Sequence, residues 1–306
     1  MIKSVKYKDI DFIKYTNCLE NSQQRKYSAT KEFLDITTQK NWEILIYNDY
    51  EAVMPIPYIK KMGFKIVHNP MLCQQLGVFS SNDSIIINDS FFSFLEENYL
   101  VRVYNFNDEN SLSTDLKKRK NFIIYPESYD IVYSKYSPKR KRKLRLDPEV
   151  KARTNTKIIS FEEAKPFMKE NLLGANKERD VDLFLDRFEM MDRQGLIVCT
   201  AFYYTGKLVN LIATYEDQKT IALLGTFNNK EYVKLSGASI LIDQTIRNSI
   251  ASKIFDFEGS ELPNVEEFFR GFRPELKPYI AYDVPIKALI KKVLNIKFIM
   301  KYIAKL

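Results

Sequence analysis

The chain has 306 residues, of which 45% are hydrophobic and 28% are charged. This composition is typical of a globular protein with substantial cores, and the length favours two domains over one. With 9 glycines, 11 prolines, 19 tyrosines and 21 phenylalanines, the sequence is neither collagen-like nor of low complexity nor intrinsically disordered.

The net charge of +8 is concentrated in two segments. Residues Ser137–Arg153 contain eight basic and two acidic residues, and residues Ile286–Leu306 contain six lysines and no acid. Each segment contributes +6, which leaves about −4 for the rest of the chain. The basicity is therefore local. It does not indicate a nucleic-acid footprint over a whole domain, although either segment suits a phosphate-bearing partner.

The rare residues restrict the chemistry. A single histidine, His68, excludes a zinc site with two His ligands. The three cysteines, Cys18, Cys73 and Cys199, lie far apart without a CxxC pair, so we expect reduced thiols in a cytoplasmic protein and no metal. The first residues carry charges throughout, and no apolar run approaches the roughly 18–20 residues of a membrane span.

In the first half of the chain, short apolar and alternating runs alternate with helical patterns. Strands are predicted at Trp42–Tyr47, Glu51–Ile59, Lys65–His68, Leu100–Asn105, Asn121–Tyr125 and Tyr129–Tyr133. Helices are predicted at Asp89–Asn98 and Ser111–Arg119.

The second half repeats this order more clearly. Strands are predicted at Thr156–Ser160, Ile197–Tyr204, Leu208–Tyr215, Thr220–Phe227, Ile254–Phe257 and Pro278–Asp283. Helices are predicted at Phe161–Asn171, Asp180–Arg193, Ser236–Ser252 and Val265–Arg270. Strand, two helices, a three-strand meander, helix, strand, helix, strand is the element order of an acetyltransferase-type α/β domain.

The basic segment Ser137–Arg153 lies between these halves. Three interpretations stay open for it. It is a solvated connecting helix, a surface for RNA, anionic lipid or a sugar phosphate, or a nuclear import signal.

Three stretches resemble a known family. Glu51–Ser80 (EAVMPIPYIKKMGFKIVHNPMLCQQLGVFS) resembles the first-half signature of bacterial proteins with two GNAT-like (N-acetyltransferase) domains. Phe227–Ser239 (FNNKEYVKLSGAS) resembles the loop that leads into the acyl-donor helix of that superfamily. Phe255–Phe272 (FDFEGSELPNVEEFFRGF) resembles the DF-x-G and F-x-x-x-F pattern of Fem-type peptidoglycan aminoacyltransferases.

The resemblance implies an α/β fold with two GNAT-like domains in tandem, each a mixed central sheet flanked by helices, followed by a C-terminal amphipathic helix. The expected boundaries are 1–136 for the first domain, 137–153 for a basic connecting helix, 154–285 for the second domain and 286–306 for the terminal helix.

The resemblance also implies a donor site. In GNAT enzymes a Q/R-x-x-G-x-G/A loop holds the pyrophosphate of acyl-coenzyme A, and the aligned residues here are Lys234, Ser236, Gly237, Ala238 and Ser239. A helix N-terminus supplies free N–H groups for such a phosphate. Ser239 departs from the family pattern, and a plain helix cap by Ser236 explains the same residues without a ligand.

An amine that attacks an acyl donor needs a base, and a carboxylate usually serves. Glu258 follows the strand Ile254–Phe257, where strand ends face the substrate crevice of an open sheet, and is the first candidate. Asp256 lies on the same strand face two residues earlier, and alternatively caps or pairs locally. Glu216, at the end of the hairpin strand, is the third catalytic candidate.

Other side chains are candidates for substrate binding. Arg270 and Arg273 suit a phosphate or carboxylate of the acceptor, or are solvated helix-end residues. Gln74 and Gln75 either line a cleft or bind backbone in a buried turn. Cys73 as a reactive thiol and Tyr282 as a general acid are weaker candidates.

The terminal segment Ile286–Leu306 places most of its lysines in one arc of a helical wheel and its apolar residues opposite. Such a helix either docks on the body or lies on an anionic membrane surface. The expected location is therefore the cytoplasm, with peripheral contact at the inner face of the membrane as the second interpretation.

The sequence thus predicts an acyltransferase that moves groups other than aminoacyl groups. The donor is acyl-coenzyme A, with acetyl-CoA as the leading species, and the acceptor is a small-molecule or lipid-linked amine of a cell-envelope or amino-sugar precursor. A Fem-like enzyme that uses aminoacyl-tRNA and a non-catalytic GNAT pair that only binds are the alternatives.

Overall fold

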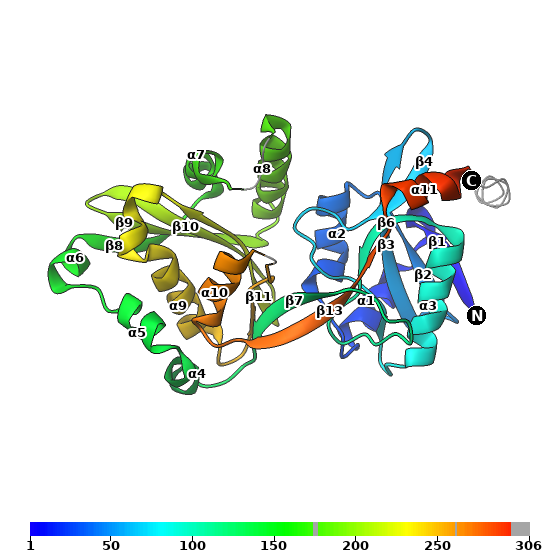
Figure 1. Cartoon of the computed structure of the whole chain (residues 1–306), viewed down its shortest axis with the longest axis horizontal. Coiled ribbons are helices and arrows are strands. Elements are labelled where there is room, and N and C mark those ends of the chain that lie inside the picture. Colours follow the sequence, from blue (N-terminus) through cyan, green and yellow to red (C-terminus); the bar gives the residue numbers. More distant parts are fainter. Residues whose placement is uncertain (174–176, 261, 295–306) are drawn as a thin grey trace. The chain divides into compact units, whose positions relative to one another are not determined.

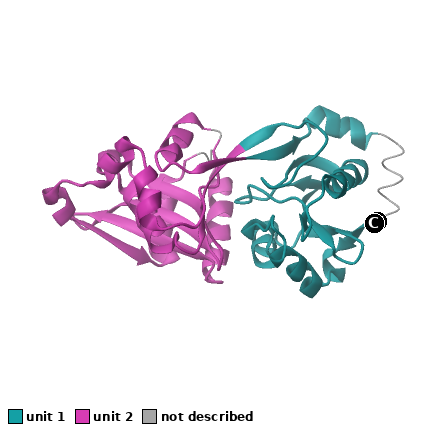
Figure 2. Cartoon of the chain, turned by 90° about the horizontal axis from the view of Figure 1, so that it is seen from below, with its two compact units in different colours: residues 1–119, 278–306 teal, residues 120–277 magenta. Residues whose placement is uncertain are grey.

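The computed structural model describes residues 1–173, 177–260 and 262–294. The chain divides into two compact units, which Figures 1 and 2 show. Unit 1 contains Met1–Arg119 and the described residues from Pro278 onward, and unit 2 contains Lys120–Lys277.

Unit 1 is built on a mixed sheet in the order β1-β2-β3-β4-β6-β13. Its strands are β1 (Ile2–Lys6), β2 (Trp42–Tyr47), β3 (Ala52–Lys61), β4 (Phe64–His68), β6 (Leu100–Asn105) and the second half of β13 (Glu275–Asp283), with β5 (Phe79–Ser80) beside β3. Only the β4–β6 pair in this order is parallel. The helices of the unit are α1 (Phe12–Glu20), α2 (Lys31–Thr38), α3 (Ile85–Asn98) and α11 (Ile286–Val293), with the 3-10 turns η1 (Tyr7–Asp9) and η2 (Tyr27–Ala29).

The core of unit 1 is centred on Trp42, which is fully buried. The rings of Tyr7, Phe12 and Tyr15 lie 5.5 to 6 Å from it in edge or tilted contact. Its indole N–H donates to the carboxylate of Asp35 at 2.9 Å, so the one polar atom of the ring is satisfied.

Unit 2 is built on a sheet in the order β7-β12-β11-β10-β9-β8. Its strands are β7 (Lys118–Ile124), β12 (Ile254–Asp256), β11 (Thr220–Asn228), β10 (Lys207–Glu216), β9 (Ile197–Tyr204) and β8 (Thr154–Ile159). Only the β11–β12 pair is parallel.

Helices cover both faces of this second sheet (Figure 1). One face carries α7 (Phe161–Asn171) and α8 (Glu178–Asp192), and the other carries α9 (Gly237–Ser249) and α10 (Pro263–Arg270). The short helices α4 (Tyr129–Lys135), α5 (Pro138–Leu144) and α6 (Pro148–Ala152) follow β7, and η3 (Lys230–Leu235) precedes α9. The predicted α/β order of the second half is therefore confirmed.

The boundaries between the two units lie at other positions than residues 136 and 285, where the two domains were predicted to end. β7 begins in unit 1 and continues into unit 2, where it pairs with β12, and β13 returns to unit 1, where it pairs with β6. Strand pairing between distant segments sets these boundaries, and such pairing leaves no local mark in the sequence. The basic segment 137–153 belongs to unit 2, where a break at Arg145 separates α5 from α6.

Two predicted elements are wrong. The helix predicted at Ser111–Arg119 is absent, because residues 111–117 form a loop. A side chain from another part of the chain binds this loop: the carboxylate of Asp89 accepts from the Ser113 N–H at 2.9 Å. The strand predicted at Tyr129–Tyr133 is helix α4, in which these two rings lie four residues apart on one face at 5.7 Å. The first 41 residues, for which no element was predicted, contain β1, α1 and α2.

The described part of the terminal segment, α11, packs on unit 1. Leu289 is buried against Leu100, and the ammonium of Lys292 donates to the carbonyl of Tyr99 at 2.9 Å. The lysines at 297, 301 and 305 lie outside the described residues. Within residues 1–173, 177–260 and 262–294, no helix combines the length and the apolarity needed to cross a bilayer.

Candidate functional site

The parallel strands β11 and β12 pair over a short stretch, because β12 has only three residues. The register joins Thr220 to Ile254 and ends at Ala222 and Asp256, whereas β11 continues to Asn228. On its other side, β11 carries an extra residue, Leu224, where the pairing with β10 shifts by one. A bulge of this kind bends the strand and frees a backbone group from the ladder. In unit 2 the pairing therefore ends at the carboxyl ends of two parallel strands, which is where open α/β sheets bind ligands.

The first turn of α9, the helix that follows β11 and η3, is tightly packed. Ser236 has the left-handed φ of 58°, its hydroxyl makes no cap hydrogen bond, and Gly237, Ala238 and Ser239 are buried. A Cβ on Gly237 would lie 2.1 Å from the Oδ1 of Asn210, so this contact requires glycine. The cap interpretation of Ser236 finds no support here. Lys234, the cation of the predicted donor loop, is exposed.

Arg140, on α5, inserts its guanidinium between α9 and α10. The residue is only 4% exposed. Nη1 donates to the hydroxyl of Ser239, and Nη2 donates to the carbonyl of Phe268 at 2.6 Å. The guanidinium carbon lies 4.3 Å from the ring centroid of Phe268 and 4.1 Å from that of Phe272. Burial lowers the pKa of Arg140 to about 10.

A cavity of about 420 Å³ opens beside Arg140, between α5 and α10. Its lining contains five basic side chains and one acidic one: Lys139, Arg140, Lys143, Arg270 and Arg273, with Glu267. Thus Arg270 and Arg273, two of the predicted substrate-binding residues, line the same cavity as the basic helix α5. Arg270 is also bound to Glu266 at 2.8 Å, and Arg273 is exposed with a φ of 58°.

Asp243 is a buried carboxylate on α9 that the sequence analysis did not single out. It accepts a hydrogen bond from Tyr129 at 2.9 Å and lies 3.8 Å from the guanidinium of Arg247. Burial raises its pKa, against the opposing effects of these two partners. It lines a second cavity, of about 620 Å³, together with Arg145 and Lys151. The only sequence signal for Asp243 is that a charged residue lies within the largely apolar stretch Ile240–Ile246.

The three predicted carboxylates lie at different places on the second sheet. Asp256 is buried at the end of β12, accepts from the N–H of Glu258 at 2.8 Å and receives the Asn121 amide at 3.3 Å. Glu258 follows it half-buried, with a φ of 58°. Glu216 is at the opposite end, because its strand partner is Ile221, near the start of β11. The structure brings Asp256 and Glu258 together and leaves Glu216 apart.

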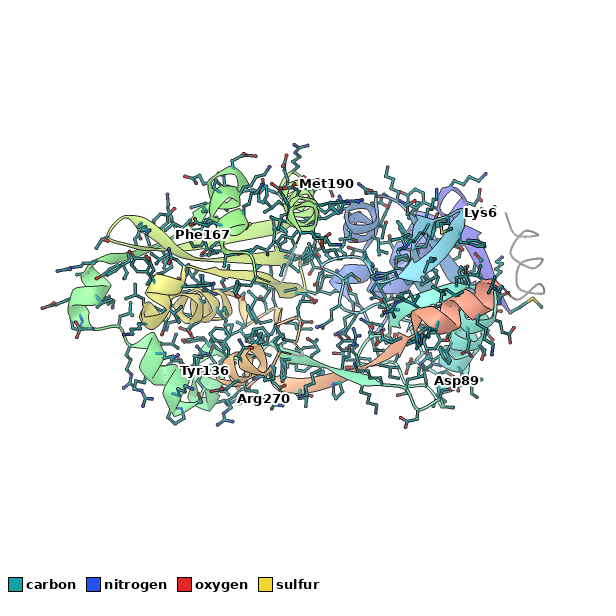
Figure 3. All side chains as sticks on the ribbon, turned by 45° about the horizontal axis from the view of Figure 1, so that its top comes forward. Lys6, Asp89, Tyr136, Phe167, Met190 and Arg270 are labelled. Carbon is teal, nitrogen blue, oxygen red and sulfur yellow. The ribbon has the colours of Figure 1, made fainter. Side chains whose placement is uncertain are left out.

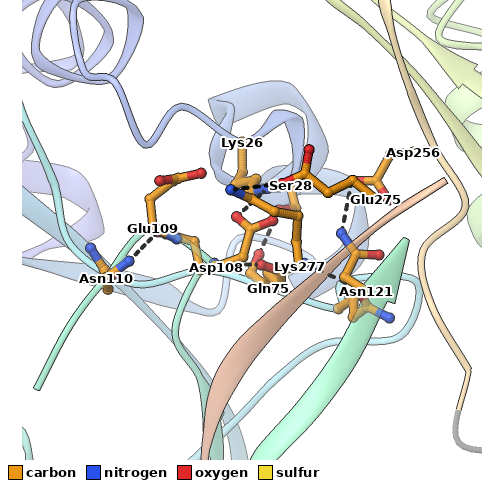
Figure 4. A network of polar contacts seen from close by, with 12 residues as sticks. Lys26, Ser28, Gln75, Asp108, Glu109, Asn110, Asn121, Asp256, Glu275 and Lys277 are labelled. Carbon is orange, nitrogen blue, oxygen red and sulfur yellow. Dashed lines mark hydrogen bonds and ion pairs between the residues drawn. The ribbon is translucent and has the colours of Figure 1, made fainter. Parts of the chain in front are cut away.

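Gln74 and Gln75 belong to unit 1, and Figure 4 shows Gln75 in a network of polar contacts. The buried Gln75 accepts from the N–H of Asp108 at 2.8 Å, and Asp108 forms a 2.6 Å ion pair with Lys26. The backbone carbonyl of Gln74 accepts from the Asn105 amide at 2.8 Å. The amide of Gln75 thus binds backbone, whereas the side-chain oxygen of Gln74 accepts from Nε2 of Gln75 at 3.2 Å.

The weaker candidates also have structural partners. Tyr282 donates to Glu96 at 3.0 Å, and burial raises its pKa. Cys73 is buried, as are Cys18 and Cys199, and none of the three forms a disulfide. Figure 3 shows the side chains of the described residues, with Tyr136 and Arg270 labelled in unit 2.

No family model matches the sequence, and no curated protein matches it. Among solved structures, the chain is similar to FemX, with a TM-score of 0.63 and 8% identity over 95% of this chain and 99% of that chain. A conserved protein of unknown function from Bacteroides thetaiotaomicron has a TM-score of 0.55 and 9% identity over 92% and 99%. A tandem GNAT protein from the clavulanic acid biosynthesis pathway has a TM-score of 0.51 and 8% identity over 92% and 97%.

The chain has a tandem GNAT fold. The predicted fold class is confirmed, and the Fem-type resemblance is confirmed at the level of the fold. In unit 2 of this fold, the pairing of β11 with β12 ends at Ala222 and Asp256, and α9 follows β11 in the chain. At identities of 8 to 9%, function has to be argued from the site itself.

Proposed function

We propose that this protein is a transferase that moves an acyl group onto an amine, and that unit 2 binds the acyl donor. The end of the β11–β12 pairing at Ala222, with β11 continuing to Asn228, is the observation that carries the proposal. It offers strand edges to an extended donor, and the bulge at Leu224 offers a backbone group to the reacting carbonyl.

Acyl-coenzyme A, with acetyl-CoA as the first species to test, is the leading donor. The loop from Lys234 to Ser239 precedes α9 and contains an exposed cation and a required glycine, Gly237. In the reaction, the amine nitrogen attacks the thioester carbonyl, the C–S bond breaks, the thiolate leaves, and the amine loses a proton to a base. This direct transfer needs neither a covalent enzyme intermediate nor a metal.

Glu258 is the proposed base. It follows the carboxyl end of β12, where the pairing with β11 ends, and the Asp256 carboxylate accepts from its backbone N–H at 2.8 Å. Asp256 thus acts as a positioning residue that fixes the turn carrying Glu258, and the Asn121 amide holds the other oxygen of Asp256 at 3.3 Å. Glu216, at the opposite end of β11, is the weaker proposal.

A second donor, aminoacyl-tRNA, is favoured by one specific observation. The hydroxyl of Ser239, at the last position of the donor loop, is already bound by Arg140 from the basic helix α5. This contact fills space beside the first turn of α9, and the adjoining cations suit a polyanionic donor. Under either donor, we propose an amine of a cell-envelope or amino-sugar precursor as the acceptor, in small-molecule or lipid-linked form.

The donor is identified by two binding assays on the full chain. A thermal-shift panel of acyl-CoA species, acetyl-CoA first, is compared with filter binding of a charged tRNA at several salt concentrations. A shift that is lost in Gly237→Val, with that variant still folded by circular dichroism, supports acyl-CoA. Charged-tRNA binding that falls steeply with salt supports the second donor. If neither donor binds, the transferase proposal fails and a non-catalytic GNAT pair remains.

A further inference from the structure

We propose that the cavity between α5 and α10 is a binding site for the pyrophosphate group of a substrate, with Arg140 as its buried anchor. No residue from Lys234 to Ser239 lines the cavity, which adjoins the predicted donor loop only through the bond from Arg140 to the Ser239 hydroxyl. The proposal names a ligand class for a site that the transferase proposal leaves unused, and it rests on the proposed function only for which substrate carries the pyrophosphate.

Arg140 is a buried charge that forms no ion pair within the described part of the chain, and its nearest acidic influence, the Asp243 carboxylate, acts on it through charge alone. Its two hydrogen-bond acceptors are neutral, the Ser239 hydroxyl and the Phe268 carbonyl, and its Nε is buried with no hydrogen-bond partner among the described residues. Buried charges in proteins are normally paired, because an unpaired one carries a large desolvation cost. An anion in the adjoining cavity would supply a countercharge in direct contact with the guanidinium.

Four other basic residues line the cavity and add to the positive charge of Arg140. Lys143 and Arg273 form no ion pair with any residue that the structure describes, and both are exposed. Lys139 and Arg270 bind Glu267 and Glu266, at 2.9 and 2.8 Å. With five basic residues and one acidic residue, the lining is at net +4. That charge matches a group with several negative charges better than it matches a single carboxylate.

The geometry also favours a phosphate over other anions. The guanidinium of an arginine is a planar fork that matches phosphate oxygens, and here it is held in place by Phe268 and Phe272 at 4.3 and 4.1 Å. Gly271 makes room for it, because a Cβ there would lie 2.9 Å from Nη2. The anchor is therefore fixed before any ligand arrives, which lowers the entropic cost of binding.

The test is isothermal titration of the full chain with inorganic pyrophosphate. We expect binding that weakens at least tenfold in the double variant Lys143→Ala with Arg273→Ala, both surface residues. The matched control is Lys207→Ala with Arg179→Ala, which removes the same two charge types from exposed positions of unit 2 outside the cavity and leaves binding unchanged. Arg140→Lys keeps the charge but loses the fork, and should also weaken binding, with its melting curve showing that it folds.

Competition between coenzyme A and pyrophosphate tests which substrate carries the pyrophosphate group. If coenzyme A competes with pyrophosphate, and the competition is lost in the cavity double variant, the donor supplies the pyrophosphate. If it does not compete, another diphosphate ester, on the acceptor side, supplies it. Absence of pyrophosphate binding, equal loss in the control pair, or binding of an RNA oligonucleotide without pyrophosphate binding overturns the proposal. None of these results depends on turnover, so the transferase proposal stands or falls separately.

Discussion

The guanidinium of Arg140 donates to the hydroxyl of Ser239, a residue 99 positions further along the chain. This bond joins the basic helix α5 to the first turn of α9. A hydrogen bond to a charged donor is stronger than a neutral one, and in a buried setting the loss of one partner leaves the other unsatisfied. Ser239 is therefore structural in this state, whichever donor the protein uses.

Replacing Ser239 by alanine should destabilise unit 2. The variant leaves Nη1 of Arg140 buried without its acceptor, which costs about 1–3 kcal/mol of unfolding free energy. Urea denaturation followed by circular dichroism measures this. Ser160→Ala, which removes the capping hydroxyl of α7 at an exposed position, is the comparison, with an expected loss of about 1 kcal/mol. A Ser239→Ala protein as stable as the wild type would show that the bond contributes nothing.

Gly237→Ala should destabilise through a steric clash rather than through backbone strain. The new Cβ would meet Asn210 Oδ1 at 2.1 Å and Phe202 at 2.8 Å, and overpacking typically costs about 1–3 kcal/mol. In an Asn210→Ala background the loss should be smaller, because one of the two obstacles is gone. A double-mutant cycle on unfolding free energies measures this coupling, and strict additivity would contradict the contact.

Asp243 gives the stability of the protein a predictable pH dependence. Burial raises its pKa above the ordinary 3.8, so the native state binds this proton more tightly than the unfolded state does. The free energy of unfolding should therefore fall as the pH rises from 3.8 through the raised value. Asp243→Asn should remove that part of the fall, whereas Asp130→Asn, exposed on α4, should not. Denaturant titrations at several pH values measure it, and parallel profiles for wild type and Asp243→Asn would refute it.

The thiols should be unreactive in the native protein. Burial raises the pKa of Cys18 to about 11 and that of Cys199 to about 12, from an ordinary value of 9.0. The thiolate fraction at pH 8 is then lower by about 100-fold and about 1,000-fold, and the thiolate is the nucleophile. Iodoacetamide labelling read by mass spectrometry should be slow in buffer and fast in guanidinium. Rapid labelling of either residue in buffer would contradict its burial.

Glu258→Gln tests the proposed base once a donor has been identified. We expect the rate constant of transfer to fall by about 100-fold or more while donor binding is unchanged, since general-base catalysis contributes about 10²–10⁴-fold. Glu149→Gln, exposed on α6 and distant in sequence, serves as the matched control and should keep full activity. Product formation is followed under saturating donor. Full activity in Glu258→Gln would assign the base elsewhere, with Glu216 the next residue to substitute.

Local sequence patterns were sufficient to predict the α/β class, the order of elements in the second half and the loop around Gly237. Strands and amphipathic helices have short hydrophobic periods, and turns have characteristic residues. The patterns failed at residues 111–119 and at Tyr129–Tyr133, where loop contacts and aromatic packing override local preference.

Tertiary structure alone decided which residues share a site. In the sequence, Arg140 is one of eight basic residues in Ser137–Arg153, and nothing distinguishes it from its neighbours. In the fold it is the one buried under α10, because its acceptors come from 99 and 128 residues away. The burial of a charge depends on the elements that surround it, and a local period cannot encode contacts at that separation. The sequence therefore located the positive charge of the chain, and the packing of α5, α9 and α10 turned one part of it into a candidate binding site.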